Sequence, residues 1–173
     1  TAKSGLKLKI NPKGFEVITV FSDGATAYVK DSKFHYWIRT ISCVKMKTTF
    51  LEIIDKDYSK DKNTVYCKGV AIPNSDSKTF QVAKNTSYFA FDKNQVYALS
   101  SSKERLQIFS DIDTGSLVFF DEIDSFTDRF RMYHYNRHFI EYISNANEDE
   151  FNRFLTNKLF FKWENGDLVD IGL

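Results

Sequence analysis

The segment "DIDTGSLVFFDE", residues 111–122, comes nearest to a metal-binding pattern. Asp111, Asp113 and Glu122 stand at positions 1, 3 and 12 of a twelve-residue calcium loop, where carboxylate oxygens bind the cation. Ser116 replaces the glycine that such a loop needs for its sharp turn. The letters Asp-Thr-Gly-Ser between "LQIF" and "LVFF" are also typical of a hairpin turn. We interpret the segment as a turn and retain a calcium loop as the weaker alternative.

A second candidate for chemistry is "HYNRHFIE". In a helix, His134, His138 and Glu141 would share one face and resemble a stripe of metal ligands. In a strand, only the two histidines would share a face. The general-base glutamate of the H-E-x-x-H pattern is missing. We interpret these residues as ordinary partly buried or surface groups, and a hydrolase built on them is the alternative with least support.

Other catalytic patterns are missing from the sequence. It contains no G-x-S-x-G elbow, no P-loop and no G-x-G-x-x-G. Two cysteines, Cys43 and Cys67, are too few for a four-sulfur zinc site. We interpret them as free buried thiols, with one disulfide as the alternative in an oxidising compartment. We therefore expect no catalytic residue and no cofactor.

The charge balance and the two tryptophans indicate which kinds of partner the protein could bind. Lys and Arg number 24 against 23 Asp and Glu, so net charge predicts no attraction to nucleic acid. Two acidic stretches could form a negative patch for a basic protein, and two tryptophans could offer faces to a protein or a sugar. The candidate partner-binding residues are therefore Asp121, Glu122, Asp124, Glu148, Asp149, Glu150, Trp37 and Trp163.

Membrane and export signals are also missing. No apolar run approaches the ~18 residues of a membrane helix. The first ten residues, "TAKSGLKLKI", do not form the apolar core of a signal peptide. The sequence starts with Thr rather than Met, which suggests a trimmed or mature form.

Aromatic residues recur at fixed distances around a series of aspartates, and internal repeats of this kind point to a repeat architecture. Units recur at Asp31, Asp61, Asp92 and, in degraded form, Asp128, at intervals of 30, 31 and 36 residues. An aromatic residue stands three positions before the first three aspartates, and Ser125 stands there in the fourth. A tyrosine follows all four aspartates by five positions. The repeat positions are Asp31, Tyr36, Phe50, Asp61, Asn63, Tyr66, Phe80, Asp92, Asn94 and Tyr97, with Tyr133 in the degraded copy.

Each unit is predicted to form about three short strands. In "YSKDKNTVYCKGVAI", Asp61 and Asn63 favour a turn, because such side chains bond their own turn amides. Apolar residues on both sides then complete a hairpin. The aspartate should shape the turn and Tyr66 should anchor the sheet. One such unit cannot bury its own face, so neighbouring units must pack together.

The two ends differ from the middle. Residues 1–30 are predicted to form strands, because "LKLKI" alternates and "GFEVITVF" is apolar and β-branched. "NANEDEFNRFLTNKL", residues 145–159, predicts a helix of about three turns with Asn147 as its cap. Asn165–Gly166 between apolar runs predicts a hairpin, and "RFRMYHYNRHFIEYI" fits strand or helix equally.

The predicted fold is mainly β, or β-rich α+β. Residues 1–173 should form a single domain, since nothing in the sequence marks a linker. Its consecutive hairpin or meander repeats of about 30 residues are expected at 15–50, 51–80 and 81–110, with a degraded unit at 111–136. The helix and the hairpin occupy residues 137–173.

"DKNTVYC" at residues 61–67 and "DKNQVYA" at 92–98 resemble the Asp-Lys-Asn-x-Val-Tyr-Tyr units of the DKNYY family. "SDSKTF" at residues 75–80 fits the link between units of that family. Cys67 and Ala98 depart from it at the second tyrosine. The resemblance covers about residues 15–110 and implies a bacterial, often exported or lipid-anchored protein with no established enzymatic activity. It favours the periplasm or cell envelope and leaves the cytoplasm open.

Stacked repeats offer a rigid extended surface, which favours a non-enzymatic protein-binding module. The sharpest form of this hypothesis is an immunity protein that neutralises a cognate bacterial toxin. The alternative is an exported envelope protein with a structural or glycan-binding role. In the alternative, sugars would stack on exposed Trp37 and Trp163.

Overall fold

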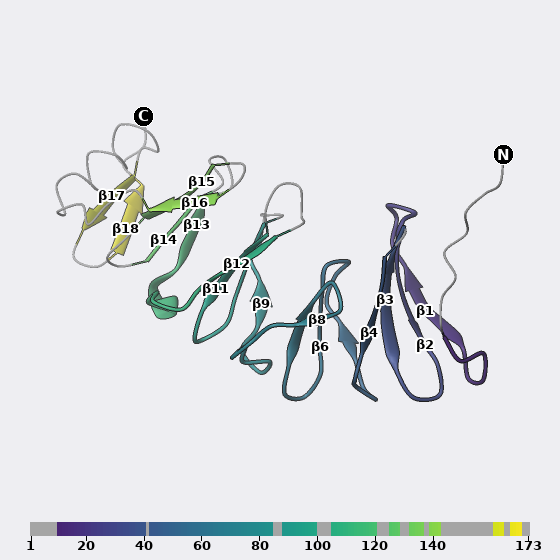
Figure 1. Ribbon diagram of the computed structural model, residues 1–173. Helices are drawn as coiled ribbons and strands as arrows, with labels where there is room; N and C mark the ends of the chain where they lie inside the picture. Colours follow the sequence, from purple (N-terminus) through teal and green to yellow (C-terminus); the bar gives the residue numbers. More distant parts are fainter. Residues whose placement is uncertain are drawn as a thin grey trace. The chain divides into compact units, whose positions relative to one another are not determined.

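The computed structural model describes residues 10–40, 42–84, 88–99, 105–120, 125–128, 132–136, 139–142, 161–164 and 167–170. Beyond residue 131 it describes the backbone of the strands and the side chain of Tyr133. Within this part of the chain the fold is almost entirely antiparallel β (Figure 1). The prediction of a mainly β fold is therefore confirmed.

Four consecutive segments each form a four-stranded sheet whose strands follow in chain order. The first contains β1 (Glu16–Val20), β2 (Thr26–Lys30), β3 (His35–Arg39) and β4 (Ser42–Met46). The second contains β5 (Glu52–Ile53), β6 (Tyr58–Lys60), β7 (Val65–Cys67) and β8 (Val70–Ala71). The third contains β9 (Gln81–Val82), β10 (Phe89–Phe91), β11 (Val96–Leu99) and β12 (Leu106–Phe109). The fourth contains β13 (Val118–Phe120), β14 (Ser125–Thr127), β15 (Met132–Asn136) and β16 (Phe139–Tyr142).

Two shorter elements complete the described chain. The hairpin of β17 (Phe161–Glu164) and β18 (Asp167–Asp170) confirms the hairpin predicted around Asn165–Gly166. The 3₁₀ turn η1 (Thr114–Ser116) is the one helical element in the described residues. The helix predicted with Asn147 as its cap lies outside those residues, so it stays a prediction. No helix in the described part is long and apolar enough to span a membrane.

The chain divides into two compact units, residues 1–80 and 81–173. The boundary after Phe80 coincides with the predicted end of the second repeat. Each unit contains two of the four-stranded sheets, and the second also contains β17 and β18. That residues 1–173 fold as one domain stays a prediction.

Each repeat holds four strands rather than the predicted three, and the Asp-Lys-Asn turn joins the second strand to the third. The same register recurs: Val29 pairs with Tyr36, Ser59 with Tyr66, Ala90 with Tyr97 and Phe126 with Tyr133. Successive strand residues point to alternate faces. We call the face that carries Tyr36, Tyr66, Tyr97 or Tyr133 the tyrosine face of its sheet, and the other the opposite face.

In the first unit, the opposite face of the β1–β4 sheet packs against the tyrosine face of the β5–β8 sheet. Tyr28, Trp37 and Met46 of the first sheet form a buried cluster with Tyr66 of the second. Gly69, in the β7–β8 turn, has a φ of +77°, and a Cβ there would lie 2.9 Å from Cβ of Val44. Glycine permits both the left-handed backbone and this close approach of the two sheets.

The second unit packs its sheets in the same manner. The ring of Phe126 lies 5.2 Å from that of Phe89 and 4.6 Å from that of Tyr133. Phe89 and Phe109 belong to the opposite face of the β9–β12 sheet. Phe126 and Tyr133 belong to the tyrosine face of the β13–β16 sheet. The core is therefore a set of aromatic rings between two sheets.

Candidate functional site: the repeated aspartate turns

The aspartate of the Asp-Lys-Asn turn fixes its hairpin with both carboxylate oxygens. Oδ1 of Asp61 accepts hydrogen bonds from the backbone amides of Asn63, at 2.9 Å, and Thr64, at 2.8 Å. Oδ2 accepts a hydrogen bond from the hydroxyl of Tyr66, at 2.8 Å. One side chain thus closes the turn and fastens the following strand.

Asp31 makes the same bonds in the first repeat. Its Oδ1 accepts from the amides of Lys33 and Phe34, at 2.8 and 2.9 Å. Its Oδ2 accepts from the hydroxyl of Tyr36, at 2.7 Å. The expected turn forms here although the sequence reads "DSKF" rather than "DKNT", because the neighbours contribute only their amides.

Asp92 makes the same bonds in the third repeat. Its Oδ1 accepts from the amides of Asn94 and Gln95, at 2.7 and 3.1 Å. Its Oδ2 accepts from the hydroxyl of Tyr97, at 2.5 Å. Asp92 and Tyr97 are 1% and 0% exposed. This Asp–Tyr pair is the most deeply buried of the three.

The degraded fourth copy keeps the strand pairing of the others. Phe126 pairs with Tyr133 at the equivalent register, and Asp128 is buried. Oδ2 of Asp128 accepts from the amide of Asp113, at 3.2 Å, as Oδ2 of Asp31 does from the amide of Asn11. The unit predicted for residues 111–136 is thus a full four-stranded repeat that extends to Tyr142.

The segment that follows a sheet fixes the tip of the preceding turn. The hydroxyl of Ser77 donates to the carbonyl of Lys62, and the hydroxyl of Thr114 donates to the carbonyl of Lys93, both at 2.8 Å. Ser77 and Thr114 both belong to the segments that lead to the next sheet. The turn tips are therefore held from inside by the aspartate and from outside by a hydroxyl.

Repeat positions that match in sequence are not all equivalent in space. Phe80 is buried and its ring lies 5.3 Å from that of Tyr58, whereas Phe50 is 68% exposed. Strand β4 ends fifteen residues after Asp31, while β8 ends ten residues after Asp61. The same nineteen-residue spacing therefore leads to different places. Phe80 serves the core as a structural repeat residue, and Phe50 does not.

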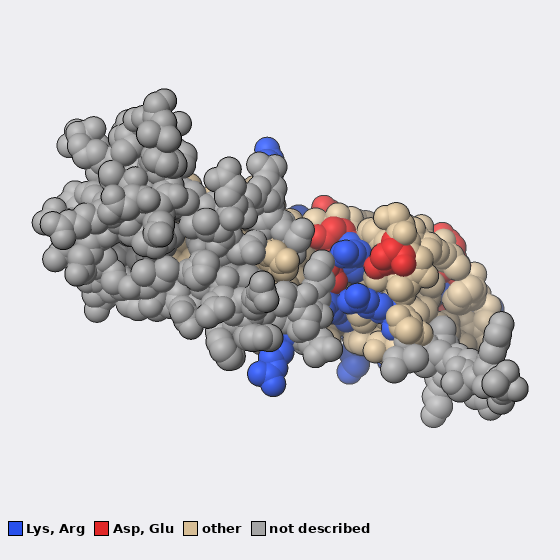
Figure 2. Space-filling model, turned by 90° about the horizontal axis from the view of Figure 1, so that it is seen from above, with Lys and Arg blue, Asp and Glu red and all other residues tan. Residues whose placement is uncertain are grey.

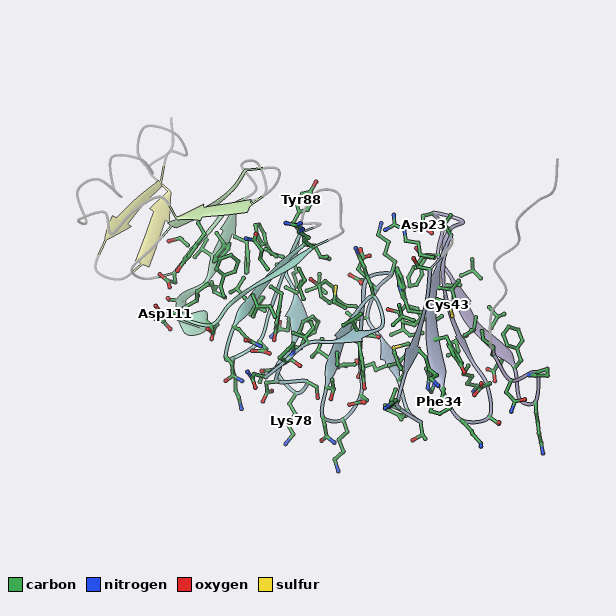
Figure 3. The ribbon with its side chains drawn as sticks, viewed as in Figure 1. Asp23, Phe34, Cys43, Lys78, Tyr88 and Asp111 are labelled. Carbon is green, nitrogen blue, oxygen red and sulfur yellow. The ribbon has the colours of Figure 1, made fainter. Side chains whose placement is uncertain are left out.

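A second set of aspartate turns was missed by the sequence analysis. Oδ1 of Asp23 accepts from the amides of Ala25 and Thr26, and Oδ1 of Asp55 accepts from the amides of Asp57 and Tyr58. These turns precede β2 and β6, at the end of the sheets opposite the Asp-Lys-Asn turns. Figure 3 shows Asp23 and Phe34 at the two ends of the first sheet. The signal in the sequence is an aspartate three residues before each second strand.

These bonds change the pKa of the residues that make them. For Asp31, burial raises the pKa of the carboxyl. Hydrogen bonds from the Lys33 amide, the Tyr36 hydroxyl and the Phe34 amide lower it by more than burial raises it, so the pKa is about 2. The opposing effects also leave the pKa of Asp61 lowered. Burial and the bond to the carboxylate raise the pKa of Tyr36 and Tyr66 to about 12. Each pair is therefore a carboxylate with a neutral phenol over a wide pH range.

We expect stability to fall at both extremes of pH. A lowered aspartate pKa stabilises the fold above the ordinary value near 4, and this contribution is lost as the pH falls toward 2. A raised tyrosine pKa stabilises the fold below pH ~10, and this is lost as the pH rises through 12. Tyrosinate absorbance should show a late ionisation near pH 12 that loses amplitude in Tyr36→Phe and again in Tyr66→Phe, while Tyr28, whose pKa burial also raises, still ionises late. Titration of all nine tyrosines near pH 10 would contradict the assignment.

The described part of the calcium-loop candidate, residues 111–120, forms the turn η1 and the strand β13. Oδ1 of Asp113 accepts from the amide of Gly115, at 3.2 Å, and caps η1. The chain then enters strand β13 at Val118, whereas a calcium loop would be followed by a helix. No group of three metal-binding side chains occurs among the described residues, which include Asp111 and exclude Glu122.

The histidine candidate lies in the β15–β16 hairpin. His134 in β15 stands directly opposite Glu141 in β16, so these two positions share a face across the strands. The sequence analysis missed this pairing because it treated the segment as one continuous helix or strand. His138 lies outside the described residues.

Of the candidate partner-binding residues, the structure describes the side chain of Trp37. Trp37 is 4% exposed, and its indole Nε1–H donates to the carbonyl of Lys56, at 2.9 Å. Trp37 is therefore a core residue, which is a correction to the expectation that its ring faces a partner or a sugar. The side chain of Trp163 is not among those described, and the acidic stretches Asp121–Asp124 and Glu148–Glu150 lie outside the described residues.

The described surface mixes charges of both signs. Figure 2 shows acidic and basic side chains interspersed on the described part of one face. Lys30 pairs with Glu16, at 2.9 Å, and Lys60 lies 3.7 Å from Glu52. Both pairs occupy the same place in their repeats, one residue before the turn aspartate. Such exposed pairs contribute little stability.

Both cysteines are free thiols in this structure. Cys67 is buried as the sequence analysis expected, whereas Cys43 is only partly buried. Burial raises the pKa of both, that of Cys67 to about 12. Because the thiolate is the reactive form, we expect a thiol reagent to modify partly exposed Cys43 first. Cys67 should react only on unfolding. Mass spectrometry of the alkylated peptides over time measures both rates, and equal rates in the folded protein would contradict this burial.

Four antiparallel meanders share one strand register, and in the first three of them the described residues also share the aspartate turn and the Asp–Tyr hydrogen bond. These features define a β-repeat protein. Its repeats are marked by the letters Asp-Lys-Asn-x-Val-Tyr at the two best-preserved turns. The chain belongs to the DKNYY family, whose profile matches residues 5–101. No curated protein and no solved structure matches the chain.

Proposed function

We propose that this DKNYY-family protein is a non-enzymatic module that binds another protein through the tips of its Asp-Lys-Asn turns. The observation that carries the proposal is the repeated presentation of exposed polar side chains on fixed turns. Lys33, Lys62, Asn63, Lys93 and Asn94 are all exposed. A side chain on a rigid turn loses little conformational entropy when it binds.

The chemistry of the tips defines the partner. Lysine ammonium groups and asparagine amides recognise carboxylates and backbone carbonyls. A protein that presents acidic side chains would therefore fit these tips. The sharpest form of the proposal is an immunity protein that covers a cognate toxin. Trp37 is buried, so its ring cannot stack on a sugar, and the glycan-binding alternative has less support.

The test is a pull-down from a lysate of the source organism with the full chain as bait. The matched baits are a triple tip variant, Lys33→Ser, Lys62→Ser and Lys93→Ser, and the variant Lys84→Ser. Lys84 is exposed and lies beyond β9, outside the Asp-Lys-Asn turns. We expect one stoichiometric partner that the triple variant loses and Lys84→Ser retains. If all baits captured the partner equally, the turn tips would not be the binding surface. If no bait captured a partner, the proposed binding function would be contradicted.

A further inference from the structure

The loop between the first two sheets presents an aromatic ring to solvent. β4 ends at Met46 and β5 begins at Glu52. Phe50, between them, is 68% exposed, the largest value among the exposed large apolar side chains of the described residues. Phe80, at the matching position of the next repeat, is buried. The fold therefore gains little stability from the ring of Phe50.

Hydrogen bonds fix the backbone of this loop. The hydroxyl of buried Thr48 donates to the carbonyl of Phe50, at 2.7 Å, and accepts from the amide of Phe50, at 3.3 Å. Nδ1 of buried His35 donates to the carbonyl of Thr48, at 2.9 Å. A side chain on a fixed backbone loses little conformational entropy when it binds. The ring of Phe50 is therefore well placed to enter a partner.

The loop lies beside the first two turns of the repeat series. His35 directly follows the first of them, residues 31–34. In the second, burial raises the pKa of Asp61, whereas hydrogen bonds from its own hairpin and from the hydroxyl of Thr48 lower it. Thr48 therefore lies next to both turns, and Phe50, two residues further on, is exposed beside them.

Lysines stand on the loop and on the segments beside it. Lys33 and Lys62 are at the two turn tips, and Lys47 is in the loop itself. Lys78 follows Ser77, whose hydroxyl donates to the carbonyl of Lys62. All four lysines are exposed, and none forms an ion pair with a residue that the structure describes. The ring therefore has positive charge around it.

The carboxylates at this end of the first unit are already bonded. Asp31 and Asp61 accept from their own turns, and Oδ1 of Asp76 accepts two hydrogen bonds from the segment that follows it. None of these three residues is fully exposed. The exposed Glu16 and Glu52 form ion pairs with lysines. Among the described residues here, the exposed charge that remains unpaired is therefore positive.

We propose that Phe50 is the central anchor of the partner-binding surface, and that the partner is a protein with an apolar pocket bordered by carboxylates. This inference rests on the proposed function and names its central residue. Aromatic residues at the centre of an interface contribute much of its binding free energy, and a polar rim excludes water from them. The ring fills the pocket, and the lysines pair with the surrounding carboxylates, which also speeds association.

A protein fits this surface better than an anionic bilayer does. A bilayer would attract the same lysines, since each basic residue near an anionic surface contributes to binding. Membrane binding through a protein surface also needs a broad apolar face that enters the lipid. A single ring is enough to anchor a protein interface, because one pocket can bury it completely.

Photo-crosslinking identifies what covers the ring. The full chain carries the photoreactive aromatic residue p-benzoylphenylalanine in place of Phe50, or in place of Val70 as the control, and is irradiated in a lysate of the source organism. Val70 is 60% exposed and lies next to the β7–β8 turn, at the end of its sheet away from the Asp-Lys-Asn turn. We expect position 50 alone to crosslink to the protein that the wild-type bait captures, through a peptide with apolar and acidic residues.

The affinity for that captured protein measures the contribution of the ring. Phe50→Ala should raise the dissociation constant by about 30-fold or more, as loss of a central aromatic anchor does. Val70→Ala is the matched control and should leave the dissociation constant unchanged. Lys47→Ser should lower the association rate and make it less sensitive to salt. Circular dichroism must show that all three variants are folded.

The outcomes separate this inference from the proposed function. Equal affinity of the wild type and Phe50→Ala for the captured protein would overturn the inference and leave the proposed function intact. Crosslinks from position 50 to phospholipid, or to a second copy of the chain, would assign the ring to a bilayer or a dimer and would also overturn it. If the wild-type bait captured no protein, the proposed function and this inference would both be contradicted.

Discussion

Asp92→Ala is expected to lower the free energy of unfolding by about 3–5 kcal/mol, because the substitution leaves several buried donors without their acceptor. The carboxylate accepts from two turn amides and from the hydroxyl of Tyr97, and it is 1% exposed. Each buried donor left unsatisfied costs about 1–3 kcal/mol, and partial access of water to the relaxed turn returns some of that. Chemical denaturation of the full chain measures the change.

Two further variants separate the tyrosine bond from the turn. Tyr97→Phe removes the hydroxyl alone and should cost about 1–2 kcal/mol. In the double variant the two losses should not add, because each single variant breaks the same bond. Asp76→Ala is the control, since its carboxylate accepts at 3.0 Å from the exposed Thr79 amide and hydroxyl, and it should cost about 1 kcal/mol. Equal costs for Asp76→Ala and Asp92→Ala would contradict the structural role of the buried pair.

The turn and the aromatic anchor could both be predicted from the sequence, but the bond that joins them could not. Aspartate before two polar residues favours a turn, because its side chain bonds the amides of its own turn. The constant spacing of aspartate and tyrosine then identifies Asp31, Asp61 and Asp92 as equivalent positions. Whether the hydroxyl of a tyrosine five residues later reaches Oδ2 depends on the twist and pleat of the hairpin. The constant spacing of Asp and Tyr across repeats was the signal, and it indicates a direct contact once the register is known.

Sequence spacing misled where strand lengths differ. Phe50 and Phe80 stand at one distance from their aspartates, but β3 and β4 have five residues each while β7 has three and β8 has two. The sequence analysis also treated Trp37 as a ring that could face a protein or a sugar, although the equivalent positions in the next two repeats, Cys67 and Ala98, are buried. Only the packing of the second sheet, with Lys56 as hydrogen-bond acceptor, places it in the core.

The residues of the Asp-Lys-Asn turns divide into those that stabilise the fold and those that are exposed to a partner. The turn aspartates and tyrosines form hydrogen bonds with each other inside their own hairpins. The residues that define the family therefore stabilise the fold. Lys62, Asn63, Lys93 and Asn94 stand at the tips of the turns, and these residues are exposed. A family marked by Asp-Lys-Asn-x-Val-Tyr thus shares a scaffold, and the partner of each member is set by what its tips and faces present.

Phe126→Ala should have the other large effect, a loss of about 3–5 kcal/mol of stability in chemical denaturation. Phe126 is 0% exposed and its ring lies 4.6–6.2 Å from those of Phe89, Phe109, Phe119 and Tyr133. The ring occupies the space between the two sheets of the second unit. Truncation leaves a cavity that the four strands carrying these rings cannot close without shifting, and it removes contacts between the two sheets.

Two controls show whether this cost comes from the position of the ring. Phe50→Ala removes the same atoms from a side chain that is 68% exposed and should change stability by about 0.5 kcal/mol or less. Phe126→Leu keeps apolar volume and should cost about 1–1.5 kcal/mol. If Phe126→Ala were as mild as Phe50→Ala, the two sheets of the second unit would not pack through this aromatic cluster.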